Sequence, residues 1–514
     1  MNALDRIFEA VAPQYAAKRI SARRRIESNK VAIGLVRAYE GAAKGRRTEG
    51  WRTIGSSANT ETRRALPILR DRSRDLVRNN PYAARAVNVI AANLVGYGIK
   101  TTIRTRNKKA SKPLQSAWVD WAESTQCDAA GQHDLYGLQE LAARTIIESG
   151  EVLMRRIWRK PGDGLAVPLQ LQVLEPDYID TGKDGEMYNG NEILQGIEYD
   201  KQGRRAAYWL FDTHPGDAYS SARTSYTSKR IPAADILHVY RMDRAGQVRG
   251  VPWFAPVILR MRDLDEYEDA QIVRQKIAAC FAAFVHDMEV GEDPTGNDAA
   301  DLTERLEPGA IQRLPAGTNV TLANPPTVQG YGEYMSVTLH AIAAGLGLPY
   351  ESLTGDYSQV NFTSGRMGRS EFHALLDVWQ WKMLVPQMCG GVFGWFLEAA
   401  VLAGLPAQGA TARYVPPRRV LVDPTREIPA QIKAIRGGLQ TLFGGIREMG
   451  YEPAEFLAEV AEGNALMDSL GLVLDSDARK VSQQGMTQAR PDGTVIPGTD
   501  IDDGSGAGDD APEE

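Results

Sequence analysis

Val251-Pro252-Trp253-Phe254-Ala255-Pro256 opens the stretch that decides the fold, and a mixed-charge run over residues 260–269 follows it. Proline is tolerated in the first turn of a helix, and apolar residues then recur at mostly helical spacing as far as Val285. The pattern therefore predicts a long helix over residues 251–285. Charges of both signs lie along it, at Arg260, Arg262, Asp263, Asp265, Glu266, Glu268 and Asp269.

The sequence on the C-terminal side of this helix predicts a helical hairpin with an inserted tip. Residues 286–332 are rich in Gly, Pro and Asp, and helix resumes over residues 333–347. Residues 348–365 are expected to form a polar loop. The last eleven residues of this loop begin with Gly355 and end with Gly365. A second long helix is expected from Arg366 to Leu402, within a segment that runs to residue 415.

On the N-terminal side the hydrophobic period changes from helical to strand-like, which indicates an α+β fold class for residues 61–250. Helices are expected over 62–95, 113–124 and 135–149, and strands over 151–159, 169–174 and 236–240. The segments 193–199 and 206–212 flank the turn Asp200-Lys201-Gln202-Gly203 and predict a β-hairpin. Helices return within residues 416–475.

Charge is distributed unevenly along the 514 residues, although the net charge is only −6. Residues 1–60 form a basic N-terminal arm, and residues 476–514 form an acidic tail whose composition predicts disorder. Phosphate neutralisation by Lys and Arg supplies most of the affinity of DNA-binding proteins. This acidic balance therefore disfavours a sequence-specific DNA-binding protein.

Membrane and secreted classes are not favoured either. The most apolar region, residues 383–405, is interrupted by Pro386, Glu398 and four glycines, and the first ten residues lack the pattern of a secretory signal. The three cysteines are far apart, which argues against a disulfide framework or a cysteine-rich zinc site. A protein assembled in the cytoplasm, with no membrane partner, is the expectation.

Motifs of enzymes are missing from the sequence. It contains no Gly-x-x-x-x-Gly-Lys-Ser/Thr loop and no Gly-x-Ser-x-Gly elbow, and its six histidines are isolated from other ligand-type residues. The carboxylates of residues 263–269 would lie around a helix rather than converge on an ion. We therefore expect no catalytic, cofactor-binding or metal-binding residues, and no enzyme activity.

Four segments in order resemble the lambda-like family of phage portal proteins. They are Arg74-Asp75-Leu76-Val77-Arg78-Asn79-Asn80-Pro81-Tyr82-Ala83-Ala84-Arg85-Ala86, Arg249-Gly250-Val251-Pro252-Trp253-Phe254-Ala255-Pro256, Gly345-Leu346-Gly347-Leu348-Pro349-Tyr350-Glu351-Ser352-Leu353-Thr354-Gly355-Asp356, and Val422-Asp423-Pro424-Thr425-Arg426-Glu427. No single segment is diagnostic, but their order and spacing extend over residues 60–470.

The resemblance implies a ring, typically of twelve subunits, at one vertex of a phage capsid, through which DNA is packaged and ejected. It implies a wing (61–250), two stem helices (251–285 and 333–347) around a clip (286–332), a tunnel loop (348–365), a long helix returning to the wing (366–415) and a helical crown (416–475). The implied partners are a terminase large subunit, a head–tail connector, and the major capsid and scaffold proteins. Double-stranded DNA would pass through the channel without sequence-specific contacts.

The same resemblance implies roles for two groups of residues. Tyr357, Gln359, Asn361, Thr363, Arg366 and Arg369 would face DNA in the channel, whereas the charged residues of 260–269 would pair between neighbouring subunits. Two alternatives remain open at this point. One is another capsid assembly or scaffold-like protein, which would form shells rather than single rings, and the other is a packaging enzyme that processes nucleic acid.

Overall fold

The computed structural model describes Glu49 and residues 55–479, apart from 107, 188, 218–226, 280–283, 286–311, 314–329, 422, 475–476 and 478. Most of the expected basic arm, nearly all of the acidic tail and most of the expected clip therefore lie outside the described residues. The chain divides into residues 1–57 and a second unit, residues 58–514, which contains every element discussed below.

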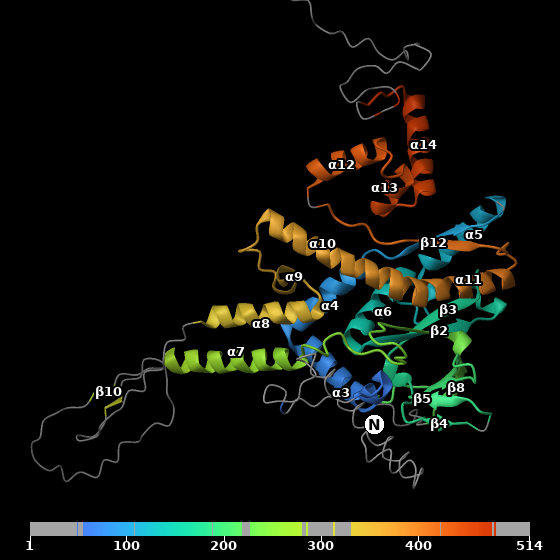
Figure 1. The fold of residues 1–514 in the computed structure, drawn as a ribbon. Helices are drawn as coiled ribbons and strands as arrows, with labels where there is room; N and C mark the ends of the chain where they lie inside the picture. The colour runs from blue at the N-terminus through green and yellow to red at the C-terminus, as the bar shows by residue number, and fades with distance from the viewer. Residues whose placement is uncertain are drawn as a thin grey trace, which may run out of the picture. The chain divides into compact units, whose positions relative to one another are not determined.

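Four helices and two short sheets form the N-terminal part of this unit (Figure 1). The helices are α3 (Ala58–Asn79), α4 (Pro81–Leu94), α5 (Lys108–Ala122) and α6 (Leu135–Ser149). The first sheet has the antiparallel order β3-β2-β9, made of Leu169–Leu174, Glu151–Trp158 and Ile236–Tyr240. The second, antiparallel sheet runs in the order β4-β5-β6-β7-β8, made of Gly185–Glu186, Glu192–Leu194, Ile197–Tyr199, Arg205–Leu210 and Lys229–Pro232.

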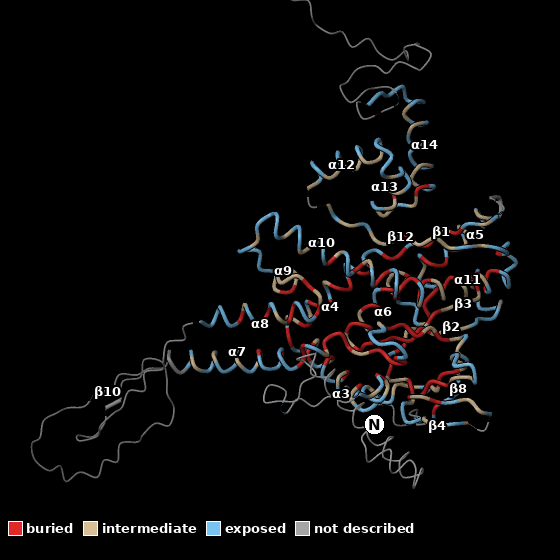
Figure 2. The backbone as a smooth tube through the Cα atoms, viewed as in Figure 1, coloured by how far each residue is buried: buried red, intermediate tan, exposed pale blue. Residues whose placement is uncertain are grey.

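The main hydrophobic core lies where α4 and α6 pack against the three-stranded sheet and the long helical segment Phe362–Leu402 (Figure 2). Ile90 and Leu94 of α4 and Ile146 of α6 are fully buried there. Trp118 of α5 packs edge-on against Phe396, with ring centroids 4.9 Å apart. A smaller cluster around Tyr208 and Ile236 joins the two sheets.

A fully buried ion cluster connects this core to the segment before the next helix. Oε1 of Glu151 lies 2.5 Å from Nη2 of Arg249 and 3.1 Å from Nη2 of Arg70, and Oε2 lies 2.8 Å from Nε2 of His238. Burial alone would raise the pKa of Glu151, but Arg249 and His238 outweigh it and hold that pKa well below its usual range. The cluster therefore carries an ionised glutamate without contact with water.

The backbone crosses itself closely at the same place. Gly150 ends α6 at φ +90°, a conformation that favours glycine, and a Cβ on Gly250 would lie 2.2 Å from the carbonyl oxygen of Gly150. Only glycine at residue 250 allows this approach, which positions the start of the next helix.

Two antiparallel helices follow, α7 (Ile258–Ala279) and α8 (Tyr331–Leu346), and they lie side by side (Figure 1). Tyr267 of α7 packs against Tyr334 of α8 with ring centroids 4.5 Å apart, and Val257 fits against Gly345. Beyond α7, the strands β10 (Phe284–Val285) and β11 (Gln312–Arg313) pair in parallel. The helix–insertion–helix order is as expected from the sequence.

A continuous helical segment of 41 residues, Phe362–Leu402, crosses the unit. It consists of α10 (Phe362–Trp379), a π-helical stretch (Gln380–Cys389) and α11 (Gly390–Leu402). Pro386 cannot donate to the helical ladder, which accounts for the widened turns. By length and apolar composition this helix could cross a membrane, but 56% of its apolar window is buried inside the protein. It therefore has the properties of a core helix.

The chain then returns to the N-terminal part and ends in three described helices. β12 (Thr411–Val415) pairs antiparallel with β1 (Lys100–Arg104), although Thr411 and Arg104 are 307 residues apart. The helices are α12 (Pro424–Arg436), α13 (Leu442–Glu448) and α14 (Pro453–Leu470). Helix α9 (Tyr350–Thr354) is described with the site below.

The predicted α+β fold class is confirmed, and several predicted boundaries are wrong. The helix expected over 62–95 is divided at Asn80 because Pro81 starts a new helix, and the strand expected over 193–199 is interrupted by Gln195 and Gly196, both at positive φ. The helix expected from residue 251 begins only at Ile258, after a run of turns, and Phe284–Val285 are a strand rather than its end.

Candidate functional site

The segment expected to be a loop over residues 348–365 is partly helical. Helix α9 occupies Tyr350–Thr354, and α10 begins at Phe362 rather than at Arg366. Asn361 starts α10 with a capping box: its side chain accepts from the Ser364 amide at 2.8 Å, and the Ser364 hydroxyl accepts from the Asn361 amide at 3.2 Å. The true connection is therefore short, Gly355 to Asn361.

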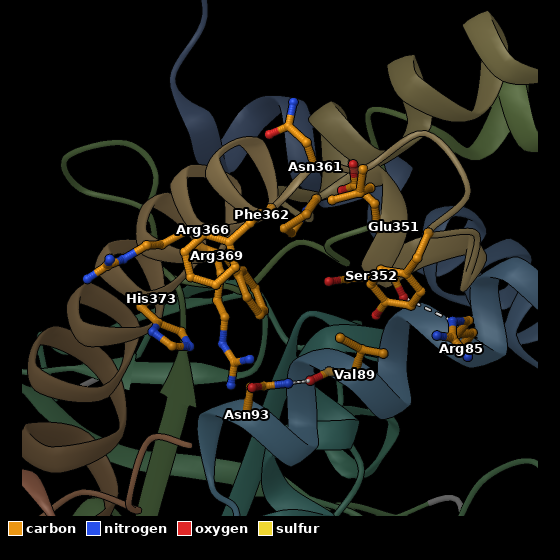
Figure 3. Close-up of a pocket in the computed structure, with 15 residues that line it drawn as sticks. Arg85, Val89, Asn93, Glu351, Ser352, Asn361, Phe362, Arg366, Arg369 and His373 are labelled. Atoms are coloured by element: carbon orange, nitrogen blue, oxygen red, sulfur yellow. Dashed lines mark hydrogen bonds between the residues drawn. The ribbon is translucent and has the colours of Figure 1, made fainter. Parts of the chain in front are cut away.

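A cavity of about 540 Å³ lies between this connection, α10 and α4 (Figure 3). Three arginines line it, Arg85 from α4 and Arg366 and Arg369 from α10, together with one carboxylate, Glu351. Arginine remains charged under all ordinary conditions. The cavity is therefore electropositive.

Each of these arginines has one bond to its own chain, which fixes its position. Nε of Arg85 donates to the Ser352 carbonyl at 2.9 Å, and Nη2 of Arg369 donates to the Val420 carbonyl at 3.2 Å. Nη2 of Arg366 lies 3.6 Å from Oε1 of Glu427. A guanidinium has five N–H donors, so further donors remain for an anionic group.

His373 is held neutral at the end of the cavity. Burial is the main cause that lowers its pKa to about 4, and the positive charges of Arg419 and Arg369 lower it further. Its imidazole therefore adds no charge at neutral pH. The three arginines, partly offset by Glu351 and by the Glu427 carboxylate beside Arg366, set the potential of the cavity.

The structure brings some of the six predicted channel residues together and separates others. Tyr357, Asn361, Arg366 and Arg369 line the cavity, whereas Gln359 and Thr363 are exposed and do not line it. Sequence reasoning missed Arg85 and His373. Arg85 belongs to the first family segment, Arg74–Ala86, but no local pattern indicates that α4 passes under the loop.

Of the charged residues on α7 that were predicted to pair between subunits, only some are exposed and without a partner among the described residues. Arg260, Asp263 and Asp269 are exposed, and Arg262 pairs with Glu266 one turn later on the same helix, at 2.8 Å. Asp265 instead accepts from Nδ2 of Asn80 at 2.6 Å, inside its own chain, and Glu268 is half-buried. Burial raises the pKa of both Asp265 and Glu268.

One group among the described residues has the composition of a metal site, Glu175, Asp177 and His214. Nη2 of Arg74 lies 2.7 Å from Oε2 of Glu175 and 2.5 Å from Oδ2 of Asp177. Nδ1 of His214 accepts from the Gly216 amide, which leaves the proton on Nε2. The guanidinium thus occupies the place that a cation would take.

The family model described as "phage portal protein, lambda family" matches residues 44–380 of the chain. The chain belongs to the lambda family of phage portal proteins. This portal protein is 24% identical over 489 residues to a probable portal protein of Halomonas phage phiHAP-1, with 89% of this chain and 92% of the relative covered. It is 23% identical to the portal protein of Escherichia phage N15 and 22% identical to portal protein B of Escherichia phage lambda. The matches cover 82% and 81% of this chain, and 88% and 87% of those relatives.

Solved structures of gene transfer agent particles are also similar. The neck of a native particle, computed with C12 symmetry, matches 71% of this chain and 89% of its own chain at 16% identity and a TM-score of 0.40.

Portal proteins are structural components of the phage particle rather than enzymes, so the expected absence of enzyme activity is confirmed by the family. The packaging-enzyme alternative is thereby excluded.

Proposed function

We propose that this portal protein assembles into a ring, with twelve copies expected, that conducts double-stranded DNA into and out of the phage head. The match over residues 44–380 carries the proposal, because it extends from before α3 to the start of the π-helical stretch. Within the ring, residues 61–250 act as the wing and 416–475 as the crown. Helices α7 and α8 act as the stem, with the clip between them.

The connection Gly355–Asn361 and the start of α10 face DNA in this proposal. Tyr357 is 63% exposed, and Arg366 and Arg369 are each bound to their own chain on one side. Because one side of each guanidinium is already bound within the chain, each arginine contacts a phosphate from one side only. A conduit needs weak, sequence-independent contacts, since many strong phosphate contacts in one ring would trap the duplex.

The exposed charges of α7 act between subunits. Arg260, Asp263 and Asp269 have no hydrogen bond or ion pair among the described residues, so they are available to a neighbouring copy. Exposed pairs contribute about 0–1 kcal/mol each. We assign them to the register between subunits rather than to the strength of the ring.

The proposal includes the partners that a conduit without a motor needs. These are a terminase large subunit, a head–tail connector, and the major capsid and scaffold proteins, with assembly in the host cytoplasm. The expected contacts with DNA are not sequence-specific.

Negative-stain microscopy of the purified full-length protein tests the ring. Single rings with a central hole are expected, whereas shells would support a capsid or scaffold-like protein and monomers would contradict assembly. A photo-crosslinking amino acid at Gln359 then tests the channel in the assembled rings. It should react with double-stranded DNA, while the same amino acid at Glu186, exposed on β4, should not.

A further inference from the structure

The helices α12, α13 and α14 bury very little of their apolar surface within the chain (Figure 2). Their described buried residues are limited to Gly445, Ile446 and Pro453, and α12 has none. Leu466 and Leu470 of α14 are 60% and 63% exposed. Amphipathic helices gain most of their stability from packing such faces, and these faces have no partner among the described residues.

One unpartnered surface is the α12 stripe, which we define as Ile428, Ile432 and Arg436. These residues follow one another at intervals of four, so they lie on one face of the helix, and all three are exposed. Lys433 is exposed beside them. The stripe is apolar toward the N-terminus of α12 and basic toward its C-terminus.

A second surface is the α14 stripe, defined as Glu459, Glu462, Leu466 and Leu470. Spacings of three and four residues place these side chains on one face, and all four are exposed. Helix α14 contains acidic residues but no Lys or Arg. This stripe is acidic toward the N-terminus and apolar toward the C-terminus.

The two stripes match in an antiparallel alignment. Ile428 would lie opposite Leu470, Ile432 opposite Leu466, and Arg436 opposite Glu462. The interval is four residues on both helices, about 6 Å of helix rise, so all three pairs form in one register. A parallel alignment with Ile432 on Leu466 would place Ile428 against Glu462 and Arg436 against Leu470.

The stripes do not pair within one chain. Helix α13 lies between α12 and α14 (Figure 1), with Ile435 of α12 packed on Gly445 and Tyr451 against Phe456 of α14 at 5.4 Å between ring centroids. Two different, complementary surfaces on one chain form a heterologous contact, which closes into a ring when the rotation permits.

We propose that the α14 stripe of one copy docks antiparallel on the α12 stripe of the neighbouring copy. The proposal rests on the proposed ring and names the residues that join the crown from subunit to subunit. Charge complementarity and the shared four-residue interval favour a second copy as the occupant. The contact buries the two isoleucines against the two leucines and pairs Arg436 with Glu462.

Disulfide trapping in assembled rings tests the register. A chain carrying Ile432→Cys and Leu466→Cys should, on mild oxidation, form a ladder of covalent multimers, because a disulfide requires Cα atoms within about 7 Å. Ile428→Cys with Glu459→Cys is the matched control, because Glu459 has no partner assigned in the contact. That pair is eleven residues out of register, about 16 Å, and should form no ladder. Unmodified protein gives the background from its own cysteines.

Variants with a single cysteine distinguish the proposed α12–α14 contact from a two-fold contact in which the same helix of two copies meets itself. Leu466→Cys alone should remain monomeric on a non-reducing gel, whereas covalent dimers would show that α14 meets α14 and would overturn the proposal. Rings without a 432–466 ladder would also overturn it, while leaving the proposed function intact. Absence of rings in the unmodified protein would overturn the proposed function and this contact together.

Charge reversal provides an independent readout. Glu462→Arg should lower the fraction of protein in rings several-fold at dilute concentration, as should Arg436→Glu, measured by mass photometry. The double variant should restore the rings, because the pair is re-formed with opposite sign. Glu186→Arg, the same charge change at an exposed β4 position, should have no effect. Failure of the double variant to recover would contradict the pairing.

Discussion

Arg249 holds the carboxylate of Glu151 with Nη2 2.5 Å from Oε1, and both side chains are fully buried. Arg249 immediately precedes Gly250, whose amide also donates to Glu151, at 2.7 Å. The ion pair therefore joins strand β2 to the segment that leads into α7, and it fixes where the proposed stem leaves the wing.

Arg249→Met is expected to lower the free energy of unfolding by about 3–5 kcal/mol, because it leaves a buried carboxylate short of its main counter-charge. Chemical denaturation of the full-length protein measures the loss. Arg262→Met is the matched control, since Arg262 forms an exposed pair with Glu266, and its cost should stay below about 1 kcal/mol. Equal losses in the two variants would show that burial of the cluster contributes nothing.

Stability is expected to fall as the pH drops from about 6.5 towards 4. Burial lowers the pKa of His238 from its ordinary value of 6.5 to about 4. The unfolded chain therefore binds more protons in this interval, so the stabilisation is complete above pH 6.5 and is lost on acidification. His373, with a pKa also lowered to about 4, acts in the same direction.

His238→Gln separates the two histidines, because glutamine can still donate to Glu151 but does not titrate. Melting temperatures measured between pH 4 and 7 should depend less steeply on pH in this variant than in the unmodified protein. His373→Gln serves as the comparison at the half-buried site. An unchanged slope in His238→Gln would refute the role assigned to His238.

Asn80 is expected to stabilise the junction of α3, α4 and α7 through two hydrogen bonds. Its Oδ1 accepts from the Ala83 amide at 2.9 Å, and its Nδ2 donates to Asp265 at 2.6 Å. Asn80→Ala removes both and should cost about 1–3 kcal/mol. Asn80→Asp keeps the helix cap but places a second carboxylate against Asp265.

The aspartate variant therefore has a distinct pH dependence. Two adjacent carboxylates raise one pKa in the folded state, so the penalty is present at high pH and is relieved as the pH falls through that raised value. Asn80→Asp should gain stability relative to Asn80→Ala between pH 8 and pH 5, as measured by thermal unfolding. A constant difference would mean that the contact with Asp265 carries no energy.

The sequence correctly predicted the bounds of those helices and strands that have a strong start signal and a strong stop signal. Helix α6 and strands β3 and β9 have the expected bounds, since Asp134 caps α6 through the Gly137 amide and Gly150 ends it. Strands β1 and β12 were missed because each is short and its partner is over three hundred residues away. Local periodicity carries no information about such pairing.

The candidate site was predictable only in part for the same reason. Tyr357, Asn361, Arg366 and Arg369 come from one contiguous segment with glycines and a capping residue, which the sequence indicates. Arg85 reaches that cavity from α4, across 267 residues from its bonding partner Ser352. Helices were expected within residues 416–475, but the exposure of the stripes on α12 and α14 depends on what the rest of the chain leaves uncovered.

Gly250→Ala is expected to destabilise the protein by about 1–3 kcal/mol or more, although alanine is the smallest possible addition. The new Cβ would lie 2.2 Å from the carbonyl oxygen of Gly150 and 2.7 Å from its carbonyl carbon, so backbone rather than a flexible side chain must move. Gly162→Ala is the control, because nothing lies within 4 Å of a Cβ there. Because the crossing sets the start of α7, Gly250→Ala should also reduce the yield of intact rings in negative stain. A variant that unfolds like Gly162→Ala and forms normal rings would contradict the close crossing of the two segments.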